Sequence, residues 1–280
     1  MKNQTTALIT LSNPGARLLA PLATALPGAR LYLHEAVRHE AVRHEPLRGE
    51  SGGAAPEAER FTKIADLTAT LFPRCRGLIF AAPVGVVVRA IAPLVRSKYE
   101  DPAVVVLDVG GRWAVSLLAG HEGGANALAI RVANILGAEP VITTTTEALK
   151  SVIVGIGCRR GTKADRIVAA VRSALAESGI ALDEVRLLAS VDIKADETGL
   201  LEAAEALDLP IRFIPAEEIR ASSREFSHSP FVEEKVKLPA VAEPAALLAG
   251  RRTRFISRKK TYGGITIAIA REGFAWSASD

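Results

Sequence analysis

The chain alternates short apolar runs with longer segments of helical periodicity along nearly its whole length. In the first half, the apolar runs predict strands at 5–11, 30–33, 77–82, 103–108, 113–118 and 141–146, and the periodic segments predict helices at 14–26, 61–72 and 84–95. Such alternation is typical of parallel sheets. The sequence is 49% hydrophobic but only 5% aromatic, so Ala, Val, Leu and Ile must build the core. That composition suits sheets that are covered by helices on both faces.

The same alternation starts again after residue 150. Strands are expected at 151–157, 185–193, 211–214, 253–257 and 264–270, and helices at 163–178, 199–207 and 243–250. A length of 280 residues is enough for two ordinary domains. We therefore expect an α/β protein made of two α/β domains, 1–148 and 149–280, each with a mainly parallel sheet flanked by helices.

Several classes of protein are disfavoured. The longest charge-free apolar run, 77–88, is too short for a bilayer and contains Pro83, and the N-terminus has no apolar signal core. Cys75 and Cys158 are too few for a disulfide framework, so we expect a cytoplasmic protein with no membrane partner. The net charge of +4 is mild and comes from scattered basic residues with few aromatics among them, so it permits nucleic acid but does not require it. A small polyanionic substrate is the alternative, and we expect no nucleic-acid partner.

Three of the five histidines lie in the repeat HEAVRHEAVRHEP at 34–46. A metal site is the functional interpretation of this repeat. On a helix, however, histidines five residues apart point about 140° away from each other, because each residue turns the helix by about 100°. On a strand they would alternate between faces. We therefore expect no metal site here, and interpret 34–60 as a solvated loop.

The stretch AGHEGGAN at 119–126 stands between an expected strand and an expected helix. Gly123 and Gly124 allow unusual backbone dihedrals and a close approach of a ligand. The following helix would direct free N–H groups at that point, which favours a carboxylate or an oxyanion. His121 can act as an acid or a base near neutral pH, and Glu122 or Asn126 could orient it. The alternative is a tight turn with a surface histidine.

A second strand–turn–helix is expected in VGIGCRRGTKAD at 154–165. It fits neither the P-loop nor the dinucleotide fingerprint, because Arg160 stands where the third glycine of the latter belongs. Thr162 is the expected helix cap, with Asp165 three residues later. Arg159 and Arg160 beside a helix N-terminus predict an anion pocket. Cys158 is a possible nucleophile, but a small buried residue is the simpler interpretation.

Three further stretches carry polar residues that fit either binding or a solvated surface. In SVDIKADETGL at 190–200, Asp192, Lys194 and Asp196 are expected to alternate along a strand end, with Thr198 capping the next helix. RKKTYGG at 258–264 predicts a basic loop that either is solvated or clamps a substrate carboxylate. The threonines at 143–146 are expected to end a strand, where their hydroxyls serve ligand contacts or helix capping.

Taken together, these motifs resemble the cobalt-precorrin-5A hydrolase family of anaerobic cobalamin biosynthesis. The segments that carry the resemblance occur in the family's order: 77–108, 116–144, VGIGCRRGT at 154–162, 190–200, 243–250 and KKTYGGITIAIA at 259–270. One departure is a further segment that many members carry between the two domains, which is nearly absent here. The C-terminal domain also resembles a small stand-alone protein of the aerobic cobalamin route.

The resemblance implies an anionic cobalt-corrinoid substrate whose δ-lactone is opened by water, with release of acetaldehyde and formation of cobalt-precorrin-5B. It implies no protein cofactor, because the substrate carries the cobalt, and neighbouring enzymes of the pathway are candidate partners. The alternative is a non-catalytic tetrapyrrole carrier.

Our hypothesis for the site makes His121 the base, assisted by Glu122, with the Gly123 and Gly124 amides as oxyanion donors. The residues expected to bind substrate are Gly123, Gly124, Asn126, Arg89, Thr143, Thr144, Gly157, Cys158, Arg159, Arg160, Gly161, Thr162, Lys194, Lys259, Tyr262 and Gly263.

Overall fold

The computed structural model describes residues 3–42, 56–227 and 240–274, which form two compact units. Unit 1 ends at Thr144 and unit 2 begins at Thr145, four residues before the expected boundary. Both units are α/β, with mixed sheets that are mainly parallel, which confirms the predicted fold class. Within these residues, no helix is long and apolar enough to cross a membrane.

Unit 1 contains a seven-stranded sheet in the order β3-β2-β1-β4-β5-β6-β7. All neighbours pair in parallel except β5 and β6, which form an antiparallel hairpin. The elements are β1 (Asn3–Thr10), α1 (Asn13–Ala25), β2 (Arg30–His34), η1 (His39–Val42), β3 (Ala58–Phe61), α2 (Ile64–Leu71), β4 (Cys75–Ala81), α3 (Val84–Ile91), β5 (Ala103–Leu107), β6 (Trp113–Leu118), α4 (Ala125–Leu136) and β7 (Glu139–Val141).

Helices cover both faces of this sheet. Leu8, Ile79 and Val105 pack with α1 and α4 on one face. Ile9, Phe80 and Val106 pack with α2 and α3 on the other. Successive residues of a strand point to opposite faces, so strands buried on both sides must be apolar throughout. The unbroken apolar runs of the sequence are therefore the central strands of the sheet.

Unit 2 contains a five-stranded sheet in the order β10-β9-β8-β12-β11. The first three strands are parallel, and β12 and β11 are antiparallel additions beside β8. The elements are α5 (Thr145–Leu149), β8 (Val152–Gly157), α6 (Ala164–Glu177), η2 (Leu182–Glu184), β9 (Val185–Val191), η3 (Asp192–Lys194), α7 (Thr198–Ala206), β10 (Ile211–Ile214), α8 (Ala216–Ala221), α10 (Ala242–Leu248), β11 (Arg254–Tyr262) and β12 (Ile265–Arg271).

Two local predictions are wrong. The row of threonines does not end a strand, because β7 stops at Val141 and α5 begins at Thr145. The basic stretch 258–262 lies within β11 rather than in a loop, and its Arg and Lys side chains protect an edge strand from pairing with other chains.

The segment 34–60 is not uniformly a solvated loop. Val37 and Ala41 are buried in the core beside α1, and residues 58–61 form β3. His34 Nε2 donates a hydrogen bond to the Thr62 carbonyl at 2.8 Å, and the His34 ring lies edge-on to Phe61. Residues 43–46 of the repeat, including His44, lie outside the described residues. Among the residues that are described, no group of three or more His, Cys, Asp or Glu could hold a metal ion.

Candidate functional site

The AGHEGGAN stretch forms a compact turn between β6 and α4. Because β6 runs antiparallel to β5, this turn lies at the end of the sheet where β4 and β5 begin. The segment that follows β7 lies at the same end, because β7 runs parallel to β6. The turn closes on itself through its backbone. The amides of Gly124, Ala125 and Asn126 donate to the carbonyls of His121, Ala119 and Gly120 at 3.2, 3.1 and 2.9 Å. The Gly124 amide is therefore already engaged, contrary to its expected role as an oxyanion donor.

Each glycine of the turn is required for its own structural reason. Gly124 has a φ of +82°, which a side chain rarely adopts. A Cβ on Gly123 would stand 2.4 Å from the Ala119 Cβ, and a Cβ on Gly120 would stand 2.6 Å from the Thr144 Cγ2. The turn therefore needs all three glycines to bring the start of α4 this close to the end of β6.

Asn126 joins three elements below the turn. Its side chain is almost fully buried, accepts a hydrogen bond from the Ser116 hydroxyl at 2.8 Å and donates one to the Thr144 hydroxyl at 2.9 Å. Asn126 and Thr144 hold β6, α4 and the segment after β7 together, and their expected role in substrate binding stays a prediction. Thr143 beside them is exposed.

We expect Asn126→Ala to lower the free energy of unfolding by about 2 kcal/mol, because it removes two hydrogen bonds from a buried site. Urea unfolding followed by circular dichroism measures this loss. The control is Thr143→Ala, on the exposed neighbour of Thr144, for which a change below about 0.5 kcal/mol is expected. An Asn126→Ala protein as stable as wild type would show that this network does not hold the turn.

His121 and Glu122 are both exposed at the tip of the turn. Glu122 accepts a hydrogen bond from the Lys98 ammonium at 2.5 Å, and this contact lowers the pKa of the Glu122 carboxyl. A carboxylate held ionised in this way is a weak proton acceptor. Of the two predicted catalytic residues, His121 is therefore the better candidate for a base. Lys98 itself was missed by the sequence analysis, because it is distant in sequence and lies in no recognisable motif.

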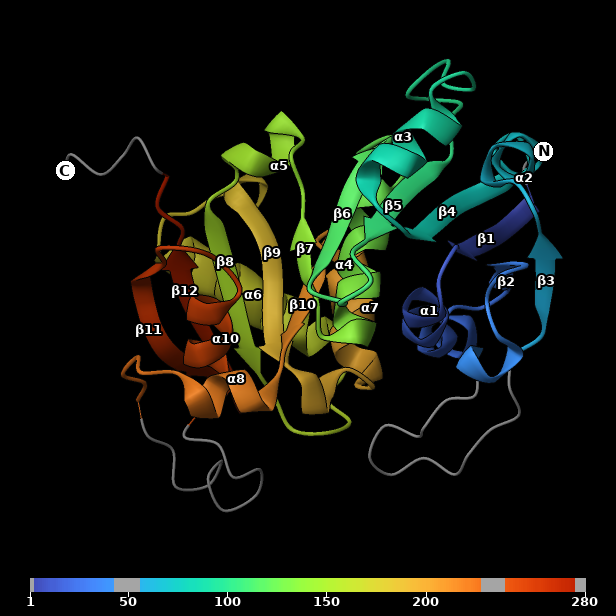
Figure 1. Ribbon diagram of the computed structural model, residues 1–280. Helices are drawn as coiled ribbons and strands as arrows, with labels where there is room; N and C mark the ends of the chain where they lie inside the picture. The colour runs from blue at the N-terminus through green and yellow to red at the C-terminus, as the bar shows by residue number, and fades with distance from the viewer. Residues whose placement is uncertain (1–2, 43–55, 228–239, 275–280) are drawn as a thin grey trace. The chain divides into compact units, whose positions relative to one another are not determined.

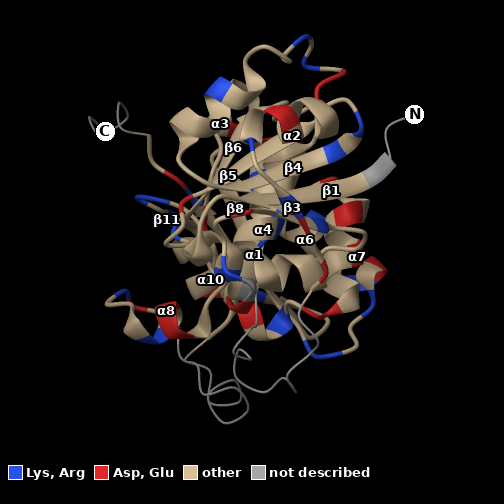
Figure 2. Ribbon diagram, turned by 45° about the vertical axis from the view of Figure 1, so that its right-hand side comes forward, with Lys and Arg blue, Asp and Glu red and all other residues tan. Residues whose placement is uncertain are grey.

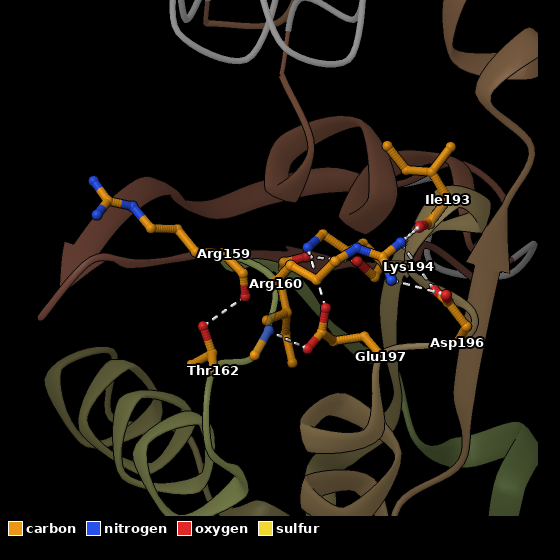
Figure 3. Close-up of polar contacts among 10 residues, drawn as sticks. Arg159, Arg160, Thr162, Ile193, Lys194, Asp196 and Glu197 are labelled. Atoms are coloured by element: carbon orange, nitrogen blue, oxygen red, sulfur yellow. Dashed lines mark hydrogen bonds and ion pairs between the residues drawn. The ribbon is translucent and has the colours of Figure 1, made fainter.

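In unit 2, the loop Gly157–Thr162 follows β8, and the segment Asp192–Glu197 follows β9 at the same sheet edge. Figure 3 shows how the two segments interlock. Arg160 makes two hydrogen bonds to the Asp196 carboxylate, at 2.8 and 3.2 Å. This pairing lowers the pKa of Asp196 and occupies the Arg160 guanidinium. The Arg159 side chain extends away from this network (Figure 3), so the two arginines do not form one anion pocket.

A buried carboxylate fixes the loop from below. Glu197 is 4% exposed, and accepts hydrogen bonds from the Gly161 amide at 2.7 Å and from Lys194 at 3.4 Å. Residues 192–194 form a short 3₁₀ helix, so Asp192, Lys194 and Asp196 do not share a strand face as expected. Nor do Thr162 and Thr198 cap helices: Thr162 donates to the Arg159 carbonyl, and Thr198 is already the first residue of α7.

Cys158 is half-buried between these segments. Burial raises the pKa of its thiol, although Lys194 and Thr162 act in the opposite direction. A thiol that stays protonated is a poor nucleophile. Cys158 therefore fits a packing role better than a catalytic one.

The remaining predicted residues lie around the β11–β12 hairpin. The Lys259 amide donates to the Glu243 carboxylate at 3.1 Å, and the Tyr262 hydroxyl donates to Glu177 at 2.9 Å. The Gly263 carbonyl accepts from Arg166, and the Gly157 carbonyl accepts from Thr266. These contacts hold the hairpin against α6, α10 and β8.

The two units match known family models in the same order along the chain. Residues 66–147 match the family described as "Cobalamin synthesis G N-terminal", and residues 152–270 match "Cobalamin synthesis G C-terminus". The fold and the ordered motifs thus define a two-unit α/β protein of cobalamin biosynthesis. The chain belongs to the cobalamin synthesis G family.

Curated relatives cover the chain to different extents. The chain is 26% identical to "Cobalt-precorrin-5A hydrolase" of Salmonella typhimurium, with 96% of this chain and 98% of the relative covered. It is also 26% identical to the protein of that name from Priestia megaterium, with 73% of this chain and 80% of the relative covered. It is 37% identical to "Protein CobE" of a Sinorhizobium species, with 45% of this chain and 83% of the relative covered. The Salmonella alignment extends over 361 positions, so that relative contains a segment that this chain of 280 residues lacks.

Proposed function

We propose that this chain is a cobalt-precorrin-5A hydrolase. Water adds to the carbonyl of the substrate's δ-lactone, and the ester C–O bond breaks. The freed hydroxyl then loses its proton and becomes the carbonyl of acetaldehyde as the adjacent C–C bond breaks. The electron pair of that C–C bond moves into the macrocycle, and acetaldehyde leaves. The products are acetaldehyde and cobalt-precorrin-5B.

The observation that carries the proposal is that both units match the family models and that a relative of that name aligns with nearly the whole chain. The site is compatible with this chemistry. The turn at 119–126 presents exposed His121 on a closed backbone, and ester hydrolysis requires a base for water and a donor for the oxyanion. Because the Gly124 amide is engaged with His121, the proposal assigns the oxyanion to the Gly123 amide.

The proposal requires no protein cofactor, since the cobalt arrives with the substrate. Arg89 on α3 and Arg159 after β8 are both exposed, which supports the proposal that each guanidinium group can bind a carboxylate. Arg160 is a weaker candidate, because binding a substrate carboxylate would require it to leave Asp196.

The test is anaerobic incubation of the purified protein with cobalt-precorrin-5A, with released acetaldehyde coupled to alcohol dehydrogenase and NADH. One acetaldehyde for each substrate consumed is the expected result. Tight binding of the corrinoid without acetaldehyde would contradict the hydrolase and favour the non-catalytic carrier, with the missing segment as the first feature to restore.

A further inference from the structure

The outer face of α3 is unusually apolar for an exposed helix. Its inner side chains Val87, Ala90 and Ile91 are buried against the sheet. Its outer residues Val84 and Val88 are 43% and 42% exposed, and lie one helical turn apart. The only charged residue of the helix is Arg89, so α3 is tan except for one blue segment in Figure 2.

Another sheet-covering helix shows the usual pattern. The exposed side of α6 in unit 2 carries Asp165, Arg166, Arg172 and Glu177, as expected for a helix that meets water. Contiguous exposed apolar side chains usually mark a surface that binds something.

The apolar surface continues beyond the end of α3. Val95 is 44% exposed and Tyr99 is 73% exposed. The turn that carries Tyr99 is well ordered, because the nearly buried Asp101 carboxylate accepts hydrogen bonds from the amides of Arg96 at 3.1 Å and Ser97 at 3.2 Å. An aromatic side chain held out on a fixed turn loses little conformational entropy when it binds. We call the set Val84, Val88, Arg89, Val95, Lys98 and Tyr99 the α3 face.

The α3 face connects directly to the turn that carries His121. The Lys98 ammonium lies 4.9 Å above the centre of the Tyr99 ring and 2.5 Å from the Glu122 carboxylate. The face thus combines apolar side chains with the cations Arg89 and Lys98, beside the candidate base. A flat apolar ring with anionic groups at its edge is the ligand that fits such a surface.

We propose that the α3 face binds the apolar face of the corrinoid macrocycle, with Arg89 and Lys98 meeting its peripheral carboxylates. This inference rests on the proposed function for the identity of the ligand. It adds a docking surface and specificity determinants to the catalytic turn. The Lys98 ammonium has three N–H donors, so it can keep its bond to Glu122 while it meets a substrate carboxylate.

The test separates binding from turnover. We would compare the full-length wild type with Val88→Asp and Tyr99→Ala in two assays: the Kd for cobyrinic acid, a cobalt corrin with free carboxylates, by isothermal titration calorimetry, and the kcat and KM for acetaldehyde release. The control is Val109→Asp, because Val109 is 43% exposed but is not part of the α3 face and lies in the β5–β6 turn, at the end of the sheet opposite to the His121 turn. Size-exclusion chromatography with light scattering gives the mass of each protein.

We expect Val88→Asp and Tyr99→Ala to raise both Kd and KM about tenfold, which corresponds to about 1.4 kcal/mol, with kcat within about twofold of wild type. The heptamethyl ester of cobyrinic acid, in which the carboxylates are uncharged, should bind wild type more weakly than the free acid does. In Lys98→Ala the difference in Kd between the acid and the ester should be smaller than in wild type. Unchanged Kd and KM in both α3-face variants would overturn the inference while leaving the hydrolase intact. So would a change of mass in Val88→Asp with corrinoid binding unchanged, because the face would then join two copies of the chain. Absence of acetaldehyde from wild type, with Kd still raised in the variants, would overturn the reaction and leave the docking surface standing.

Discussion

His121→Ala is expected to lower kcat for acetaldehyde release by at least about 100-fold while KM changes little. Loss of a general base typically reduces the rate by about 10² to 10⁴. His121 is exposed at the tip of the turn, so its removal leaves the core of unit 1 intact. Single-turnover kinetics with saturating substrate measure the chemical step directly.

Two further variants separate a base from a mere contact. His121→Gln keeps a hydrogen-bonding side chain but cannot accept the proton, so it should be as slow as His121→Ala. Added imidazole should restore part of the activity of His121→Ala and none of the activity lost in a docking variant. Glu122→Gln should reduce kcat much less, because Lys98 already holds that carboxylate ionised. Turnover of His121→Ala within twofold of wild type would remove His121 from the mechanism.

The apolar runs predicted most of the sheet correctly because strands buried on both faces leave an unmistakable pattern. The strands β1, β2, β5, β6, β8 and β10 all lie within a few residues of their expected positions. The strand expected at 253–257 is confirmed as the first part of β11, but the prediction failed for 258–262, where the run Arg258, Lys259 and Lys260 on an edge strand resembles a loop. It also failed at 34–42, where Val37 and Ala41 are buried although charged neighbours surround them in sequence.

The candidate site was harder to predict, since its contacts join residues that are distant in sequence. No local pattern pairs Lys98 with Glu122, or Arg160 with Asp196. The backbone of the turn also changes the role expected for the glycines. A sequence shows that Gly124 permits an unusual conformation, but only the fold shows that its amide then donates to the His121 carbonyl.

Glu243→Ala is expected to lower the free energy of unfolding by about 3 kcal/mol or more. Glu243 lies in the first turn of α10 and is fully buried. Its carboxylate accepts hydrogen bonds from the Ser227 amide at 2.6 Å, the Ser227 hydroxyl at 2.9 Å and the Lys259 amide at 3.1 Å. Removing it leaves three partly buried donors without their acceptor, which typically costs about 3 kcal/mol. The matched control is Glu202→Ala, on the exposed side of α7, with an expected change below about 0.5 kcal/mol.

The contribution of Glu243 should also depend on pH in a defined direction. Burial alone would raise the pKa of this carboxyl, but the hydrogen bonds from Ser227 and Lys259 and the nearby Arg258 outweigh it and lower the pKa. A glutamate in the unfolded chain has a pKa of about 4.3. The native state therefore gains stability from ionised Glu243 above that pH, and loses it as the pH falls from there through the lowered native pKa. Urea unfolding at pH 7 and again below pH 4 should show the difference between wild type and Glu243→Gln shrinking at the acid end. A difference that stays constant between the two pH values would mean that the bonds to Ser227 and Lys259 do not depend on the charge of Glu243.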